Sequence, residues 1–190
     1  MFTFDEKKST QAAAAFLRMA GGTMNYMVLL KLLYLLDRAA IQKWARPVTG
    51  DKCYSMKHGP VLSNVLKLVS EMPEPENSSY WASHISPQTS YAVELTKDPA
   101  SGALSESEDR LIEEVYGEYG SFKDKPFDLV RHLHETLPEW DEVKEGRRVL
   151  SHLKILRAVN PDEEAVARIH DEWKSLSSDM NALNSLYNRA

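Results

Sequence analysis

Apolar residues are densest between Met24 and Trp44, where they cover most of the circumference of a predicted helix. Leu29, Leu33 and Leu36 follow helical spacing on one face, and the leucines and alanines between them form a second apolar face. A helix that is apolar nearly all round is typical of the centre of a domain, because both faces need packing partners. We therefore expect this helix to be the core element of the fold.

A shorter amphipathic helix precedes the core helix, over about residues 6–20. Asp5 is a suitable N-cap, because its side chain can accept a hydrogen bond from a free backbone N–H of the first turn. Gly21-Gly22 should end this helix, since glycine readily adopts the left-handed conformation that closes helices. Thr23 is then expected to be the N-cap of the core helix.

The region after the core helix predicts short strands followed by a third helix. Pro47 prevents the core helix from continuing, and residues 48–57 read as one or two strands around a Gly50-Asp51 turn. Gly59-Pro60 is predicted to open a helix that runs to about Leu68, with proline in the first turn.

A change of composition marks residues 72–90, which are rich in proline, serine and acidic residues. Such a segment is typical of a mobile surface loop, and Tyr80 and Trp81 are embedded in it. Alternating apolar positions over 91–95 predict a strand. We expect this strand to pair with residues 53–57.

Helical patterns dominate the second half of the chain. Ser105 and Glu108 have the spacing of a capping box, in which each side chain binds the backbone N–H of the other. Pro126 is suited to begin the next helix. The apolar run over 149–159 is predicted to be a helix, with a strand as the close alternative.

The last pattern begins at Asn160-Pro161, where a capping residue and a first-turn proline predict a helix start. Apolar positions then alternate three and four apart, which forms a stripe suited to one groove or one partner helix. Because the stripe is short for a free-standing coiled coil, docking onto the domain or a partner protein is favoured over a homodimer. The stripe consists of Val166, Ile169, Trp173, Leu176, Met180, Leu183 and Tyr187.

Together these patterns predict an α+β fold that is predominantly helical. We expect a compact helical domain with a small antiparallel β-sheet over residues 1–159. A long C-terminal amphipathic helix, within residues 160–190, should pack on the domain or on a partner. The composition agrees, because 43% hydrophobic and 27% charged residues in a chain of 190 are ordinary for one globular domain.

Composition also predicts a cytoplasmic location. Cys53 is the only cysteine, which suits a reducing compartment, and the start of the chain has no hydrophobic signal core. The longest apolar run, over 26–36, is shorter than the roughly 20 residues that cross a bilayer. A net charge of −5 gives no general attraction to nucleic acid.

Candidate catalytic and metal-binding residues are few. His132 and His134 are two positions apart, so on a helix they point to nearly opposite faces and do not converge on one ion. Cys53 and His58 lack the nucleophile turn and the glycine-rich loop of a hydrolase. The glycine pattern of a nucleotide-binding loop is also absent. We therefore expect no catalytic residue, no metal site and no cofactor.

Two charged residues, Lys31 and Asp37, interrupt the apolar core helix. A buried charge without a partner is costly, so each should form an ion pair or reach the rim. This structural interpretation is favoured over a polar patch on a binding face, which stays open.

The segment Lys57-His58-Gly59-Pro60 places a cation and an imidazole beside backbone amides at an expected helix start. Such a turn can hold a carboxylate or phosphate of a partner, although a simple strand-to-helix connection is favoured. Aromatic residues that we expect on the surface are candidate anchors for a protein partner. The candidate partner-binding residues are Lys31, Asp37, Lys57, His58, Gly59, Pro60, Tyr80, Trp81 and Trp173.

Several short motifs stand in a characteristic order along the chain. They are KLLY at 31–34, DR at 37–38, RPVTGD at 46–51, MKHGPV at 56–61, LSESE at 104–108, VYGEYG at 115–120 and LVRHLHETLPEW at 129–140. In this order they resemble the Panacea domain of SocA-like antitoxins, which also occurs in phage-associated bacterial proteins. The long acidic and proline-containing loop at 73–79 departs from the family's pattern, and it bears on which partner is recognised.

The resemblance implies a non-enzymatic antitoxin that neutralises a cognate toxin by direct binding. Such a toxin is commonly encoded by the adjacent gene. The resemblance also implies that the protein can act as an adaptor, delivering the toxin to an ATP-dependent protease.

Two other functions stay open. One is a DNA-binding transcriptional regulator that reads DNA with the predicted helix at 59–68. It would use a basic strip of Arg147, Arg148, Lys154 and Arg157, but the acidic domain and the apolar helix count against it. The other is a hydrolase that uses His58 or His134.

Overall fold

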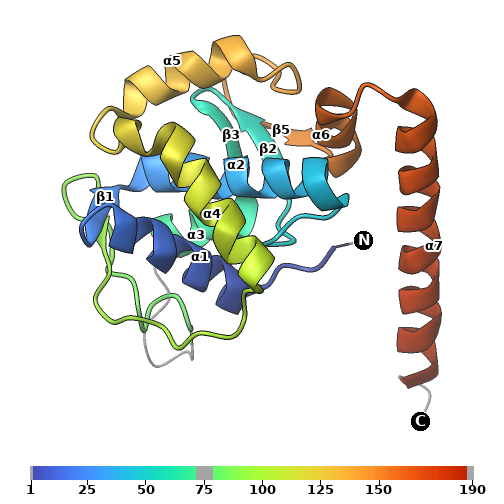
Figure 1. Cartoon of the computed structure of the whole chain (residues 1–190), viewed down its shortest axis with the longest axis horizontal. Helices are drawn as coiled ribbons and strands as arrows, with labels where there is room; N and C mark the ends of the chain where they lie inside the picture. Colours follow the sequence, from blue (N-terminus) through green and yellow to red (C-terminus); the bar gives the residue numbers. More distant parts are fainter. Residues whose placement is uncertain (1, 72–78, 188–190) are drawn as a thin grey trace.

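The computed structural model describes residues 2–71 and 79–187, and the side chains up to Asp179. The fold is α+β and predominantly helical, as predicted, with small antiparallel sheets (Figure 1). In chain order its elements are α1 (Glu6–Met19), β1 (Thr23–Asn25), α2 (Tyr26–Trp44), β2 (Cys53–Met56), β3 (Gly59–Leu62), α3 (Ser63–Ser70), β4 (Ala92–Glu94), α4 (Glu106–Tyr119), the short 3-10 helix η2 (Gly120–Phe122), α5 (Pro126–Thr136), β5 (Arg147–Leu150), α6 (His152–Val159) and α7 (Glu163–Tyr187).

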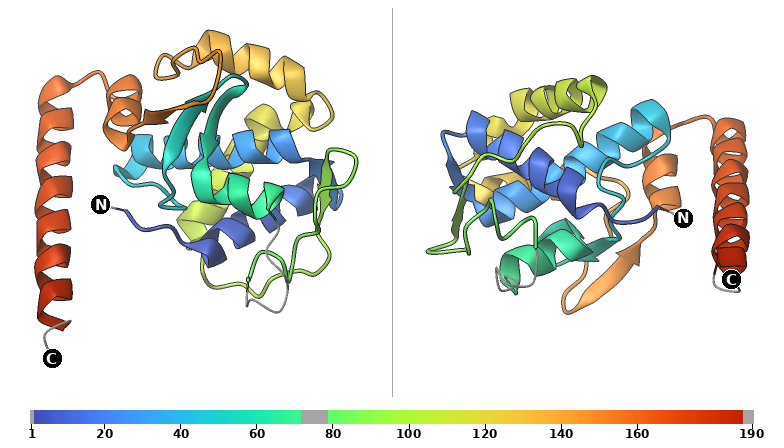
Figure 2. Two further views of the ribbon diagram at one scale, coloured as in Figure 1. Left: turned by 180° about the vertical axis from the view of Figure 1, so that it is seen from behind. Right: turned by 90° about the horizontal axis from the view of Figure 1, so that it is seen from below.

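The apolar helix α2 lies at the centre, as its pattern predicted. The right-hand view of Figure 2 shows α2 between α4 and the layer that contains β5 and α3. Leu29, Leu32, Leu33 and Leu36 are all completely buried. At about 25 cal/mol per Å² of buried apolar surface, this burial is the main source of stability for the domain.

The strands β3, β2 and β5 form one antiparallel sheet, with β2 in the middle. Met56 pairs with Gly59, so the β2–β3 hairpin turns at Lys57-His58. Of the one or two strands expected over 48–57, one is present as β2, but within that segment no strand precedes Gly50-Asp51, so this pair does not join two strands. The prediction that Gly59-Pro60 opens a helix was wrong, because these residues lie in β3. Helix α3 starts only after β3, because the distant Asp51 carboxylate accepts hydrogen bonds from the first-turn backbone N–H groups. These bonds come from Asn64 at 2.8 Å and Val65 at 3.0 Å.

A second sheet pairs β1 with β4, and Met24 lies opposite Val93. The strand expected at 91–95 thus exists, but its predicted pairing with residues 53–57 was wrong. Thr23 lies in β1, and the N-cap of α2 is Asn25, whose side chain accepts a hydrogen bond from the Met27 backbone N–H at 2.9 Å. The three-residue strand β1 is too short to show the alternation of apolar and polar residues by which a strand is recognised in a sequence. For this reason Thr23 was predicted to be a helix cap.

The second half has the predicted helices, but α7 begins at Glu163 and not at the predicted Asn160-Pro161, which lie before the helix. The capping box of Ser105 and Glu108 is present at the start of α4. The apolar run over 149–159 divides into the end of β5 and helix α6, so the helix prediction was right for its second part only. At the start of α7, Asp162 accepts hydrogen bonds from the backbone N–H groups of Glu164 and Ala165, both at 3.0 Å.

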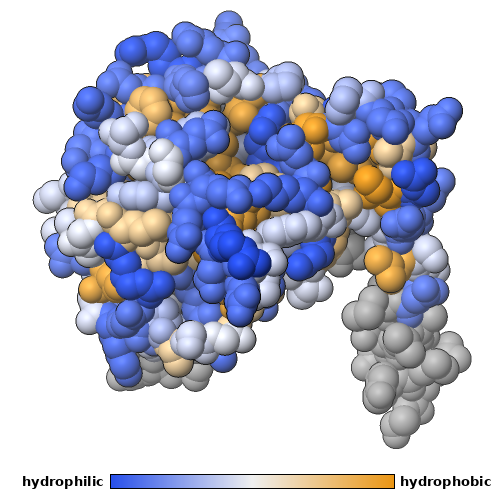
Figure 3. Space-filling view, in the orientation of Figure 1, coloured by the Kyte–Doolittle hydropathy of each residue, from blue (hydrophilic) through white to orange (hydrophobic). Residues whose placement is uncertain are grey.

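Helix α7 runs beside the body and extends past it (Figures 1 and 2). Hydrophobic side chains gather where α6 and the first half of α7 meet the body, whereas the outer side is hydrophilic (Figure 3). The predicted stripe residues Met180, Leu183 and Tyr187 lie outside the described side chains, and the predicted loop at 72–78 lies outside the described residues. The proposed boundary between residues 159 and 160 stays a prediction.

Candidate partner-binding surface

Lys31 lies in the most apolar helix of the chain, and only 1% of it is exposed. Its ammonium group donates a hydrogen bond to the Pro60 carbonyl oxygen at 2.8 Å. Burial lowers the pKa of Lys31 to about 7, because the charged form loses its hydration. An ammonium group has three N–H donors, and only this one bond is formed within the described residues. Two donors are therefore available.

The β2–β3 hairpin brings Gly59 directly over Lys31. Gly59 has a φ of +89°, a conformation that residues with a side chain rarely adopt. A Cβ atom at this position would lie 3.4 Å from Lys31 Nζ and 3.7 Å from His134 Nε2. The missing Cβ of Gly59 therefore leaves room for one methyl group beside the Lys31 ammonium group and the His134 imidazole, and we call this position the Gly59 gap.

His134 is held in place by stacking. Its ring lies parallel to that of Trp140, with centroids 3.8 Å apart, and the Trp140 indole N–H donates a hydrogen bond to the Met56 carbonyl oxygen at 3.1 Å. His134 Nε2 is buried and has no hydrogen-bond partner among the described residues. Burial, followed by the charges of Lys31 and His58, lowers the pKa of His134. A neutral ring with an unused nitrogen thus borders the Gly59 gap.

Exposed residues form a rim around this gap. Lys57 and His58 are exposed at the hairpin turn, and the His58 ring meets the Phe127 ring edge-on at 6.0 Å. Phe127, near the start of α5, is 61% exposed, which is unusual for a large apolar side chain. We call the combined patch the hairpin–α5 surface; it consists of Lys31, Lys57, His58, Gly59, Pro60, Phe127, His134 and Trp140.

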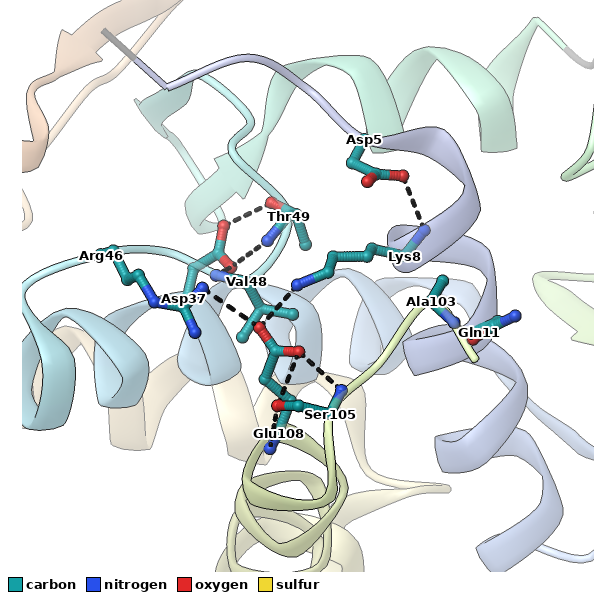
Figure 4. Close-up of polar contacts among 10 residues, drawn as sticks. All are labelled: Asp5, Lys8, Gln11, Asp37, Arg46, Val48, Thr49, Ala103, Ser105 and Glu108. Atoms are coloured by element: carbon teal, nitrogen blue, oxygen red, sulfur yellow. Dashed lines mark hydrogen bonds and ion pairs between the residues drawn. The ribbon is translucent and has the colours of Figure 1, made fainter. Parts of the chain in front are cut away.

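Asp37 occupies a different setting on the same helix. It is completely buried, and it accepts hydrogen bonds from the backbone N–H groups of Val48 and Thr49, both at 2.8 Å, and from the Thr49 hydroxyl. Burial raises its pKa to about 7, although these bonds favour the ionised form. Figure 4 shows how the carboxylate fastens the segment after α2. Asp37 is therefore a structural brace, away from the surface.

A second buried carboxylate, Glu108, joins three segments of the chain (Figure 4). It accepts bonds from Lys8 on α1 at 2.7 Å and from Arg46 at 3.3 Å, and it completes the capping box with Ser105. These contacts connect α1 and α4 with the segment that follows α2. They use up the acceptor capacity of the group, so this cluster is structural.

Trp81, predicted to be a surface anchor, is instead part of the core. The whole residue is buried, because its segment is tied to α1: Glu6 accepts hydrogen bonds from the Trp81 backbone N–H at 3.0 Å and from the Ser79 hydroxyl at 2.7 Å. Tyr80 is partly exposed, and its ring packs on His84 at a centroid distance of 4.4 Å. Neither residue belongs to the hairpin–α5 surface.

Trp173 is partly buried and docks α7 onto the domain. Its indole N–H donates a hydrogen bond to the Ala45 carbonyl oxygen, directly after α2, at 2.9 Å. The Phe2 ring lies between His152 and Trp173, with centroids 5.3 Å from each. The sequence expectation that the last helix packs on the domain fits these contacts, and they leave little of Trp173 for a partner.

The cysteine and the remaining histidines do not form a reactive cluster. Cys53 is buried, and burial raises the pKa of its thiol well above the ordinary value. Its sulfur lies 4.0 Å from His152 Nε2, while His58 sits beyond the other end of β2. His132 stacks on Phe122 at 5.8 Å, away from His134. Within residues 2–71 and 79–179, no three His, Cys, Asp or Glu side chains are grouped as metal ligands.

A cavity of about 620 Å³ lies elsewhere, between α1, α4 and residues 98–104. Polar and charged residues line much of it, and Arg18 pairs with Asp98 there. No residue of the hairpin–α5 surface borders this cavity.

Sequence reasoning missed two members of the surface, Phe127 and Trp140. It also considered His134 only as a metal ligand or a catalytic base. A usable signal was present, because a lysine on an apolar helix with no acidic residue one turn away needs a partner from elsewhere in the fold.

Comparison with protein-family models matches residues 29–141 to the family described as antitoxin SocA-like, Panacea domain. The matched segment contains every residue of the hairpin–α5 surface, and α7 lies outside it. Searches of curated proteins and of solved structures found no match. Among the described helices, none has the length and apolar character needed to span a membrane.

Proposed function

The chain belongs to the family of SocA-like antitoxins with a Panacea domain, and from this premise we propose that it neutralises a cognate toxin by binding it directly. The toxin would be the product of the adjacent gene, and the two proteins would meet in the cytoplasm. The observation that carries the proposal is the family match over more than half of the chain.

The surface within the matched segment supports a binding role. It combines an exposed aromatic ring, an exposed lysine and a histidine around a buried cation. Aromatic anchors beside desolvated polar groups are typical of the centres of protein interfaces.

The proposed mechanism requires no catalysis by this chain. A histidine that activates a nucleophile must lie within hydrogen-bond reach of it. His134 Nε2 has no such partner in the described part of the chain, and the buried Cys53 has a raised pKa that disfavours the reactive thiolate. We therefore propose a non-enzymatic protein that works without a cofactor.

Contacts around α3 and β5 disfavour the DNA-binding alternative. The residues 59–62, expected at the start of a reading helix, form β3 instead, and the Asp51 carboxylate occupies the N–H groups at the start of α3. Within the basic strip, Asp141 pairs with Lys154 at 2.6 Å and with Arg148 at 3.8 Å. A single carboxylate thus offsets one of the four positive charges of the strip, which weakens its attraction to DNA.

Co-expression with the adjacent gene tests the proposal. We expect the neighbouring product alone to arrest growth, and this chain to restore growth and to co-purify with that product. If the neighbouring product is harmless, or growth returns without any complex or loss of the toxin, the proposal is wrong.

The same experiment separates two forms of neutralisation. A stable complex with unchanged toxin level indicates direct inhibition. Disappearance of the toxin, reversed by deleting the ATP-dependent proteases of the host, indicates that the chain is an adaptor for proteolysis. The mass of the purified complex shows whether a homodimer of this chain takes part.

A further inference from the structure

We propose that the free edge of β5 is a docking site for an extended acidic segment of the toxin, which adds a strand to the β3–β2–β5 sheet. The partner named here rests on the proposed function, whereas the open edge is a feature of the fold. β5 is the last strand of its sheet and pairs only with β2. The right-hand view of Figure 2 shows β5 at the margin of the molecule, with no helix or strand drawn below it.

The alternation of hydrogen bonds shows which side of β2 each residue faces. In an antiparallel pair, the backbone N–H and C=O groups of successive residues point to opposite sides of the strand. The Lys52 carbonyl oxygen, directly before β2, accepts a hydrogen bond from the Ser63 backbone N–H, directly after β3, at 2.8 Å. Lys52 thus faces the β3 side, and by alternation Cys53 and Ser55 face β5.

On β5, Leu150 and Arg148 lie opposite Cys53 and Ser55 and direct their backbone groups toward β2. Val149 and Arg147 alternate with them, so their N–H and C=O groups point away from the sheet. Among the described residues, none forms a hydrogen bond with these four outward groups. All four are therefore available to an added strand, as in β-augmentation.

The opposite edge of the sheet, along β3, is closed. Pro60 has no N–H to offer, and its carbonyl oxygen already accepts the hydrogen bond from Lys31 at 2.8 Å. All four residues of β3 are buried, whereas Val149 on β5 is 68% exposed. The sheet is thus protected at one edge and open at the other, and an open edge pairs readily with another chain.

The side chains of β5 favour an acidic partner. Arg147 and Val149 share one face of the strand and Arg148 lies on the other. The Arg147 guanidinium lies over the Tyr54 ring at 4.5 Å and forms no ion pair among the described residues. An antiparallel strand with an apolar residue followed by two acidic ones would place these opposite Val149, Arg148 and Arg147 in turn. A second copy of this chain would instead bring two further arginines to the edge, and like charges across strands are destabilising.

The open edge continues the hairpin–α5 surface. Arg147 pairs with Met56, the last residue before the Lys57-His58 turn, so the start of β5 lies beside that turn. One partner can therefore add a strand to β5 and contact the turn together. The edge lies outside the segment matched to the family, residues 29–141, and the family match does not cover it.

Val149→Pro is the decisive variant, because it removes an outward N–H without removing a bond to β2. Proline is tolerated on edge strands where its missing N–H would face solvent. Its matched control is Val149→Thr, which keeps the N–H and a β-branched side chain. Arg147→Glu reverses one charge at the edge, and its control Arg157→Glu reverses an exposed charge on α6. Arg147→Glu decides the proposal even where the proline variant does not fold.

The first measurement requires no toxin and follows the backbone N–H groups of the full chain by NMR. In the free chain, we expect the N–H groups of Arg148 and Leu150 to exchange slowly with solvent and those of Arg147 and Val149 to exchange rapidly. Titration with a capped peptide of sequence TVEET should shift the Arg147 and Val149 signals saturably, whereas TVKKT should not. Absence of a saturable shift with TVEET would overturn the site. Slow exchange at Val149 that becomes rapid on dilution would identify a second copy as the occupant and overturn the proposal.

The second measurement uses the product of the adjacent gene. In the complex, we expect exchange at Arg147 and Val149 to slow by roughly tenfold or more. The affinity should fall by roughly tenfold in Val149→Pro and in Arg147→Glu, while both controls bind as wild type. A complex that leaves exchange at both positions unchanged would overturn the toxin as occupant. If the wild-type chain does not bind the neighbouring product at all, the proposed function fails, while the peptide titration still decides the site.

Discussion

Lys31 and Asp37 lie on the same helix, are almost completely buried and each have a pKa shifted to about 7, yet they differ in how their bonds are completed. Asp37 accepts three hydrogen bonds from Val48 and Thr49. Lys31, within the described residues, donates a single one to Pro60. Burial and a shifted pKa thus do not show whether the hydrogen-bonding capacity of a charged side chain is used up; the number of its hydrogen bonds does.

The difference has an energetic meaning. Removing one partner of a complete buried network leaves the others unsatisfied, and this is strongly destabilising. Removing a buried charge that lacks an opposite charge instead relieves a desolvation cost. The two residues should therefore respond to substitution with opposite signs.

The largest effect is expected for Asp37→Ala. Two backbone N–H groups and the Thr49 hydroxyl would lose their acceptor, so we expect the free energy of unfolding to fall by about 3 kcal/mol. Urea denaturation followed by circular dichroism measures this change. A loss below about 1 kcal/mol would contradict the assignment of Asp37 as a brace.

Lys31→Met should increase the free energy of unfolding, whereas Asp37→Ala decreases it. The lowering of the Lys31 pKa from 10.5 to about 7 corresponds to a cost on the order of 5 kcal/mol for the buried charge at neutral pH or below. Part of it is offset by the lost hydrogen bond to Pro60, so we expect a net gain of roughly 2 kcal/mol. The same denaturation experiment applies, and a clear loss of stability would show that Lys31 is a structural residue.

The pH dependence of stability sharpens the contrast. Asp37 has a pKa raised from 3.8 to about 7, so the folded state binds the extra proton between these values and stability falls as pH rises through them. Lys31 has a pKa lowered from 10.5 to about 7, so the unfolded chain binds the extra proton above pH 7 and stability rises again. In each of these two pH ranges the free energy of unfolding changes by up to about 1.4 kcal/mol per pH unit.

Other groups also titrate between about pH 4 and 10. The contributions of Asp37 and Lys31 are therefore isolated by subtracting the stability curve of a variant from that of the wild type. Burial alone shifts the pKa of Lys31, whereas the hydrogen bonds of Val48 and Thr49 and the charge of Asp51 also act on the pKa of Asp37. The wild-type stability curve minus the Asp37→Ala curve should show only the fall in stability below about pH 7. The wild-type curve minus the Lys31→Met curve should show only the rise above about pH 7. Flat difference curves would show that the two groups keep their ordinary pKa values.

Thr49→Val should give the smallest effect. It removes one of the three donors to Asp37 and the acceptor for the Asp51 backbone N–H, but keeps the shape of the side chain. We expect a loss of about 1 kcal/mol and a further rise of the Asp37 pKa, since the hydroxyl favours the ionised carboxylate. Thr49→Ser, which keeps the hydroxyl, serves as the control and should retain most of the stability.

The sequence predicted the features that depend on neighbouring residues. The capping box at Ser105, the proline-led start of α5 and the apolar character of α2 are local patterns, and all are present. Lys31 and Asp37 were also recognised as exceptional, because a charge on an apolar helix is visible without any structure. Their opposite settings were not, since these depend on chain segments that fold back onto α2.

The β2–β3 hairpin was missed because its signals are ambiguous. Glycine followed by proline suits the start of a helix as well as the start of a strand after a turn. The residue that decides is Asp51, which caps α3 from 13 positions away through Asn64. Similarly, the contact between His134 and the Gly59 gap joins α5 to a hairpin about 75 residues earlier, and no local spacing encodes it.

The position of Phe2 between His152 and Trp173 has a consequence for biosynthesis. Phe2 is translated before the matched segment, whereas Trp173 is translated after it. The segment matched to the Panacea domain, 29–141, is therefore exposed to the cell before this aromatic clasp can close. The hairpin–α5 surface should therefore form in a newly made chain before Phe2 can contact α6 and α7.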